Sequence, residues 1–202
     1  MSTTDIWGCS RQINAAKYFA QLCASTCYSC EADKLSSLVL LAHLACLIDD
    51  KAGLVNDEHI CANATGLHIA SFNTSPFLPR FYNPNDKIQQ IEDFRKIPNT
   101  SFKPCYQYDK TKIEDVKDVL YRIFLSFGAY PREMLNEITA HTSMYPKIDF
   151  WTFPGGSLLL PPQAVGEYIR RLTQAYNKCT DGVDVVQSLV SDILLDIDEK
   201  KG

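Results

Sequence analysis

The spacing of apolar positions predicts two neighbouring helices near the start of the chain. Small and apolar residues recur at three-and-four spacing in both segments, at Ile13, Ala16, Ala20 and Cys23 and again at Leu35, Leu38, Ala42 and Ala45. A third helix is predicted from about Asn56 to Gly66, because asparagine caps helix starts and a left-handed glycine often ends a helix. These three segments would form the first part of a helical bundle.

Four further helices are predicted in the second half of the chain. The first begins at a capping box formed by Thr111 and Glu114, and its apolar stripe stops at Gly128. The other three are expected over residues 131–141, 161–176 and 183–197. The linker 149–162, DFWTFPGGSLLLPP, has short strand character.

Helical periodicity is lost between these two halves. Residues 72–110 contain five prolines around one short helical candidate at 86–94. A segment of this length is either held across the core by its aromatic side chains or used for function. We therefore expect a mainly α fold: one helical bundle domain over residues 1–202, with about seven helices, a long irregular central segment and room for a short β-hairpin.

Composition is that of an ordinary globular domain. The 202 residues are 46% hydrophobic and 22% charged, which is enough to bury one substantial core without disulfides. The longest apolar run, LVLLAHLACLI at 38–48, is too short to cross a bilayer, and the N-terminus lacks the build of a signal peptide. These features predict a cytoplasmic protein with reduced cysteines and no membrane partner.

Charge is unevenly distributed. The net charge of −4 argues against a general nucleic-acid binder, since phosphate binding needs a clustered basic surface. Residues 77–112 carry seven Lys or Arg against four Asp or Glu, interleaved with seven aromatics, whereas residues 181–202 carry six acids and two lysines. The acidic final helix, 181–200, is expected to be solvated, and the middle segment is the better candidate for a contact surface.

Three cysteines, Cys23, Cys27 and Cys30, have the C-x3-C-x2-C spacing of an iron–sulfur site in radical enzymes. Such a site needs a loop after a β-strand, so that three thiolates converge on one cluster. Here the preceding residues predict a helix, and the cysteines continue a row of small residues that begins at Ala16. We therefore interpret them as core residues.

A zinc site is an open alternative. Cys27 and Cys30 are followed by His43 and Cys46, which together have the number and spacing of ligands in a structural zinc site. However, His43 and Cys46 fall in a segment that predicts a buried helix, and a buried histidine is more often hydrogen-bonded within the core. We assign no metal or other cofactor.

Motifs of nucleophilic, metalloprotease or nucleotide-dependent enzymes are absent. The sequence contains no G-x-S-x-G, H-E-x-x-H, phosphate loop or G-x-G-x-x-G. We therefore expect no enzyme activity.

Three blocks of the sequence agree in order with a known family. They are INAAKYFAQLC, then DKLSSLVLLAHLACLIDDKAGLVNDEHICANATG, then DVLYRIFLSFGAYPREMLNEITAHTSMYPKIDFW. Across residues 11–177 the chain resembles a divergent member of the Panacea domain family, which comprises SocA-like antitoxins and phage-associated proteins. The positions that match the family's motif are Gly66, Gly128, His141 and Trp151. We expect structural roles for them: the glycines as left-handed helix ends, His141 as a helix C-terminal cap and Trp151 as a lid on the core.

The resemblance implies a function in protein binding. Members of the family neutralise toxins by direct contact, and some present the bound toxin to a protease. On this basis the partner is a toxin or a host defence or regulatory protein, and the contact surface is predicted in the aromatic and basic segment 77–108, with Phe81, Tyr82 and Tyr106 as anchors. The alternatives are a phage or mobile-element inhibitor of a host defence complex, a small zinc-stabilised or thiol-dependent enzyme, and nucleic-acid binding through the same segment.

Overall fold

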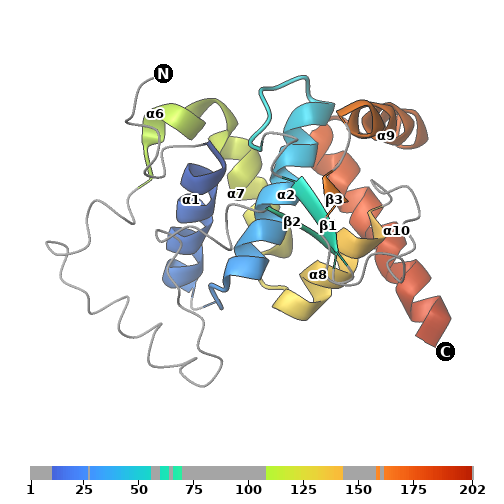
Figure 1. The fold of residues 1–202 in the computed structure, drawn as a ribbon, viewed down its shortest axis with the longest axis horizontal. Helices are drawn as coiled ribbons and strands as arrows, with labels where there is room; N and C mark the ends of the chain where they lie inside the picture. Colours follow the sequence, from blue (N-terminus) through green and yellow to red (C-terminus); the bar gives the residue numbers. More distant parts are fainter. Residues whose placement is uncertain are drawn as a thin grey trace, which may run out of the picture.

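The described part of the chain is mainly helical. The structure, a computed structural model, describes residues 11–26, 28–55, 60–63, 66–69, 108–142, 158–159 and 162–201 (Figure 1). These ranges contain six helices of ten residues or more: α1 (Arg11–Thr26), α2 (Ala32–Ile48), α7 (Lys117–Phe127), α8 (Arg132–His141), α9 (Pro162–Ala175) and α10 (Gly182–Lys201). The mainly α fold class is thereby confirmed, with six such helices where about seven were predicted.

Helix α2 is the centre of the fold. Figure 1 shows it between α1 and α10, and it also contacts α7, α8, α9 and strand β2 (Gly66–Ile69). Every residue from 34 to 46 is buried. Such a helix needs apolar or hydrogen-bonded side chains on all sides, and LVLLA at 38–42 provides the apolar ones. The predicted stripe of Leu35 and Leu38 is therefore only one of the buried faces of α2.

The third predicted helix is wrong at the residues that the structure describes. Strand β1 (Ile60–Asn63) and β2 form an antiparallel hairpin, in which Ile60 pairs with Ile69 and Asn63 with Gly66. Both isoleucines are fully buried, and the Ile69 N–H donates a hydrogen bond to the buried Ser36 Oγ at 3.1 Å. Packing against α2 thus decides the conformation of a segment too short for its own propensity to do so.

A third strand completes the small sheet. Strand β3 (Leu158–Leu159) pairs antiparallel with β1, which gives the strand order β2-β1-β3. The strand character predicted within 149–162 is confirmed at these two residues.

Helix α7 begins differently from the prediction. A short helix α6 (Lys110–Ile113) and a 3-10 turn η3 (Glu114–Val116) lead into it. The N-cap of α6 is Asp109, whose carboxylate accepts a hydrogen bond from the Thr111 N–H at 3.0 Å, so the cap lies two residues before the predicted Thr111. The predicted stripe is nevertheless buried, and the helix ends at Phe127.

The start of α10 lies against the end of α2. A Cβ atom added at Gly182 would lie 2.1 Å from the Ala45 carbonyl oxygen, so only glycine allows this approach. The Gly182 N–H donates to Asp49 Oδ1 at 2.6 Å, and Asp181 accepts hydrogen bonds from the Val183 and Asp184 N–H groups. Among the described residues, no helix is long and apolar enough to span a membrane.

Candidate functional site

An aromatic cluster joins α1 and α7 to Tyr28 and Tyr108, which lie in the connecting segments. The rings of Tyr18 and Tyr108 meet edge to face with centroids 5.2 Å apart. Phe124 of α7 lies 6.4 Å from Phe19 and 5.9 Å from Tyr28, measured between ring centroids. Such pairs add to the stability gained by burial alone, so the cluster fixes α7 against α1.

The cluster opens onto solvent along α7. Tyr121 and Leu125, four residues apart, share the solvent-facing side of α7, and the buried Phe124 lies one turn from Tyr121 at the edge of that side. Their exposed fractions are 45% and 64%, and that of Tyr28 is 37%. Burial and the neighbouring phenols of Tyr108 and Tyr121 raise the pKa of Tyr18. We name Tyr28, Tyr108, Tyr121 and Leu125 the aromatic face.

The predicted contact segment ends at this face. Its three anchors, Phe81, Tyr82 and Tyr106, lie outside the described residues, but its last residue, Tyr108, is described and packs on Tyr18. The next N–H, that of Asp109, donates to Asn14 Oδ1 of α1 at 2.7 Å. The segment therefore rejoins the helical core beside the exposed residues of α7.

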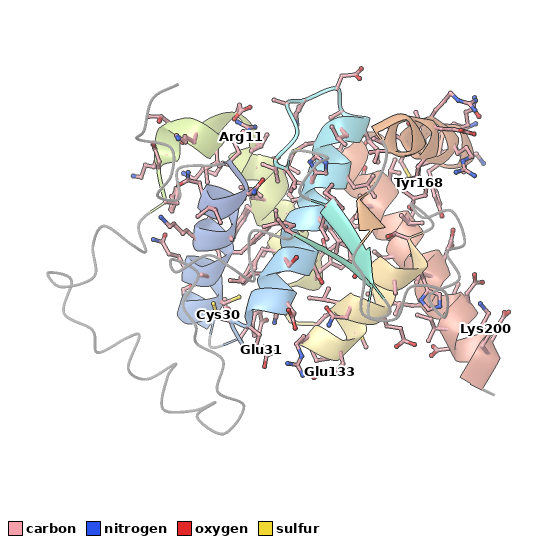
Figure 2. All side chains as sticks on the ribbon, in the orientation of Figure 1. Arg11, Cys30, Glu31, Glu133, Tyr168 and Lys200 are labelled. Carbon is pink, nitrogen blue, oxygen red and sulfur yellow. The ribbon has the colours of Figure 1, made fainter. Side chains whose placement is uncertain are left out.

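A pair of cysteines lies where α1 connects to α2 (Figure 2). The row of small residues predicted through Cys30 ends earlier, because α1 stops at Thr26 and residues 28–31 form the connection. Cys23 is fully buried near the end of α1, and Cys30 is partly exposed in the connection. Both cysteines are free of disulfides, and each of the two thiols shifts the pKa of the other. We name these two residues the thiol pair.

A buried lysine lies close to the thiol pair. Lys34 is only 1% exposed, its Nζ is 3.4 Å from Ser29 Oγ, and it lies 5.6 Å from the centroid of the Tyr28 ring. Burial lowers the pKa of Lys34, while the two cysteines and Glu31 act in the opposite direction. No carboxylate of the described residues forms an ion pair with this ammonium; Glu31 instead pairs with Arg132, with 3.5 Å between Oε2 and Nε.

The two thiols titrate as a unit. The hydrogen bond from Cys30 and the charge of Lys34 lower the pKa of Cys23 against the effect of burial. The same hydrogen bond, together with burial, raises the pKa of Cys30 well above its usual value. The pKa values of the two thiols are thus shifted in opposite directions, and Cys23 is the more acidic of the two.

The four residues of the predicted zinc site are not assembled where the structure describes them. Cys27 lies outside the described residues, and Cys30 is paired with Cys23. His43 Nδ1 accepts hydrogen bonds from the Leu54 and Val55 N–H groups at 3.0 and 3.3 Å, and burial lowers the pKa of His43 to about 4. Within the described ranges, no three His, Cys, Asp or Glu residues are arranged to hold a metal.

The family-motif positions are placed as follows. Gly66 lies in β2, and Gly128 follows α7 with φ −62°, so neither is a left-handed helix end. His141 is the last residue of α8, and its Nδ1 lies 2.8 Å from the Glu137 carbonyl oxygen, as a C-terminal cap requires. Trp151 lies outside the described residues.

Sequence reasoning missed the pairing of Cys23 with Cys30 because it extended α1 through both. The signal that could have found it is the lysine four residues after Cys30, which a buried helix start does not otherwise favour.

Comparisons with protein-family models, with curated proteins and with solved structures found no match for this chain.

Proposed function

We propose that this chain is a protein-binding module with an antitoxin-like role, which neutralises or presents a partner protein by direct contact. The observation that supports it is the aromatic face, where exposed tyrosine and leucine side chains lie beside the end of the predicted contact segment. Protein interfaces are enriched in aromatic residues and depleted of charge at their centre. The resemblance stated above supplies the antitoxin-like part of the proposal.

The aromatic face is held on a rigid support. Helix α7 buries Val119, Leu120, Ile123, Phe124 and Phe127 on its inner side. Arg122 of α7 binds Asp181 at 2.6 Å and Asp184 at 3.0 Å, which ties the helix to α10. Side chains fixed in this way lose little conformational freedom when a partner binds, and more of the contact energy then appears as affinity.

Co-expression with the product of the neighbouring gene, followed by affinity purification, tests the proposal. We expect the wild-type chain to retain the partner, and the double variant Tyr121→Ser with Leu125→Ser to retain at least about tenfold less, because truncating two anchors costs a few kcal/mol. A second double variant, Tyr82→Ala with Tyr106→Ala, tests the predicted segment. The matched control is Leu195→Ser, which changes a 63% exposed leucine on α10.

The outcomes separate the alternatives. Equal recovery by the wild type and both double variants would remove this surface from consideration. A captured partner that arrests growth when expressed alone supports the antitoxin-like role, whereas a subunit of a host defence complex supports the inhibitor alternative. Thermal unfolding of each variant checks that the fold is retained, as expected for the exposed positions Tyr121, Leu125 and Leu195.

A further inference from the structure

The aromatic face is bordered by an unpaired carboxylate. Asp118 of α7 is exposed, precedes Tyr121 by three residues and forms no hydrogen bond or ion pair with the described residues. Residues three or four apart on a helix are neighbours, so Asp118 lies beside Tyr121, and Leu125 follows one turn further along. The exposed stripe of α7 therefore carries an acidic, an aromatic and an aliphatic side chain in that order.

Further carboxylates lie where α7 meets α10. Arg122 Nη1 lies 2.6 Å from Asp181 Oδ2, and Arg122 Nη2 lies 3.0 Å from Asp184 Oδ1, so two carboxylates share one guanidinium. About a third of each of these three side chains is exposed. Glu114, one turn before Asp118, is also exposed. We name Glu114, Asp118, Asp181 and Asp184 the acidic border.

The acidic border keeps a negative charge after the neighbouring cations are counted. The cations of α7 are Lys117, which is partly buried, and Arg122, which is already held by two carboxylates. Asp115, the other acid that precedes α7, is balanced by Arg11 at 2.9 Å. Charges on adjacent helical turns are closer together than the Debye length of about 8 Å at physiological salt, so they act as a group on an approaching partner.

The aromatic face consists of side chains of a helix, which decides the form of partner that fits it. The backbone N–H and C=O groups of α7 are bonded within the helix, so an extended peptide finds no strand edge to pair with. A second helix can place its own side chains between those of α7, because the side chains of both helices repeat at three and four residues.

We propose that the aromatic face binds a basic amphipathic helix of the partner protein. The apolar residues of this helix cover Tyr121 and Leu125, and a Lys or Arg one turn away pairs with Asp118. The inference rests on the proposed function and adds the chemistry of the partner to it. Charge complementarity favours a basic helix at this place and repels an acidic one.

The test uses the full chain and two synthetic peptides of about 18 residues, long enough to form a helix. Both have leucine at three-and-four spacing along one side. The residues that flank the leucines are lysine in one peptide and glutamate in the other. Fluorescence anisotropy of the labelled peptides measures the Kd of each. We expect the lysine peptide to bind at least about tenfold more tightly, and the difference to shrink as salt is raised from about 0.01 to 0.15 M.

Three variants locate the binding. Asp118→Asn should weaken binding of the lysine peptide about threefold to fivefold, as the loss of one exposed ion pair requires. The matched control, Asp198→Asn, makes the same change in net charge at an exposed position of α10 and should change the Kd by less than about twofold. The double variant Tyr121→Ser with Leu125→Ser should weaken both peptides at least about tenfold. Asp118 also suits the dipole at the start of α7, so thermal unfolding of each variant separates stability from binding.

The outcomes distinguish this proposal from the proposed function. Equal Kd values for the two peptides, with both weakened in the double variant, would keep the contact surface and refute its preference for a basic partner. An equal loss in Asp118→Asn and Asp198→Asn would assign the attraction to the net charge of the chain. No binding of either peptide at about 1 mM would also refute the proposal, whereas co-expression tests the proposed function separately. A chain that elutes as a dimer, and as a monomer after the double substitution, would instead assign the aromatic face to a second copy.

Discussion

Replacing Gly182 with alanine tests the closest contact between α10 and α2. The new Cβ would lie 2.1 Å from the Ala45 carbonyl oxygen and 2.9 Å from its carbon, both backbone atoms that no side-chain rotation can move. The start of α10 must therefore shift, which also disturbs the 2.6 Å hydrogen bond from the Gly182 N–H to Asp49. We expect a loss of about 3 kcal/mol in the free energy of unfolding, from overpacking and a weakened bond to a charged acceptor.

Gly166→Ala is the matched control. Gly166 lies in α9, and nothing lies within 4 Å of a Cβ added there. Alanine is the better helix former, so we expect this variant to gain about 0.5–1 kcal/mol. The opposite signs of the two changes distinguish the close contact from any general effect of replacing glycine.

Urea unfolding followed by circular dichroism at 222 nm measures both variants. The midpoint should fall clearly for Gly182→Ala and rise slightly for Gly166→Ala. If the two midpoints move in the same direction by similar amounts, the reasoning about the α2–α10 contact is refuted. A fall in midpoint that Asp49→Ala reproduces in full would instead assign the loss to the hydrogen bond alone.

Two further predictions concern charge. Burial lowers the pKa of His43 to about 4, below its unfolded value near 6.5, so between these values the unfolded chain binds a proton that the folded chain does not. The free energy of unfolding should therefore fall by about 3 kcal/mol as the pH decreases from 7 to 4, and urea midpoints across this range measure it. A His43→Gln variant with the same pH dependence of stability would contradict this reasoning. Asp181→Ala removes both the cap of α10 and the ion pair with Arg122, and we expect it to lower the free energy of unfolding by about 1–2 kcal/mol. Arg122→Gln keeps the cap and removes only the partly exposed ion pairs with Asp181 and Asp184, so its loss should be less than about 1 kcal/mol and should shrink in 1 M salt.

Sequence patterns predicted best the helices that are buried on one side. In α7 the apolar positions Leu120, Ile123 and Phe127 face the core while Tyr121 and Leu125 face solvent, so the period of 3.6 residues is visible in the sequence. In α2 the pattern is weaker because the helix is covered on all sides, and the sequence alone gives no preferred face. The helix was predicted, but its central position followed only from the structure.

The segment 60–69 shows why local preference was insufficient. Its predicted helix rested on the capping tendency of Asn56 and Gly66, which adds little over so short a length. Burial of Ile60 and Ile69 together requires the two residues to face each other across a hairpin, and Ser36 of α2 supplies the acceptor for the Ile69 N–H. These contacts lie up to 33 residues apart in the sequence, where periodicity carries no information.

The candidate sites were only partly predicted, because they too depend on contacts between different segments of the chain. Cys23 was expected in the core and is fully buried there, because its position depends on the stripe of α1 alone. Its relation to Cys30 depends on where α1 ends, because Cys30 lies in the connection after Thr26. The aromatic face likewise needs Tyr28 and Tyr108 to reach α1 and α7 from connecting segments, so a pattern within any one helix cannot reveal it.

Tyr28 connects the aromatic face to the surroundings of the thiol pair. Its ring packs on Phe124 of the aromatic cluster, and it also lies over the Lys34 ammonium, two residues before Cys30 in sequence. The ring therefore shields from water the same charge that lowers the pKa of Cys23, while its exposed edge belongs to the aromatic face.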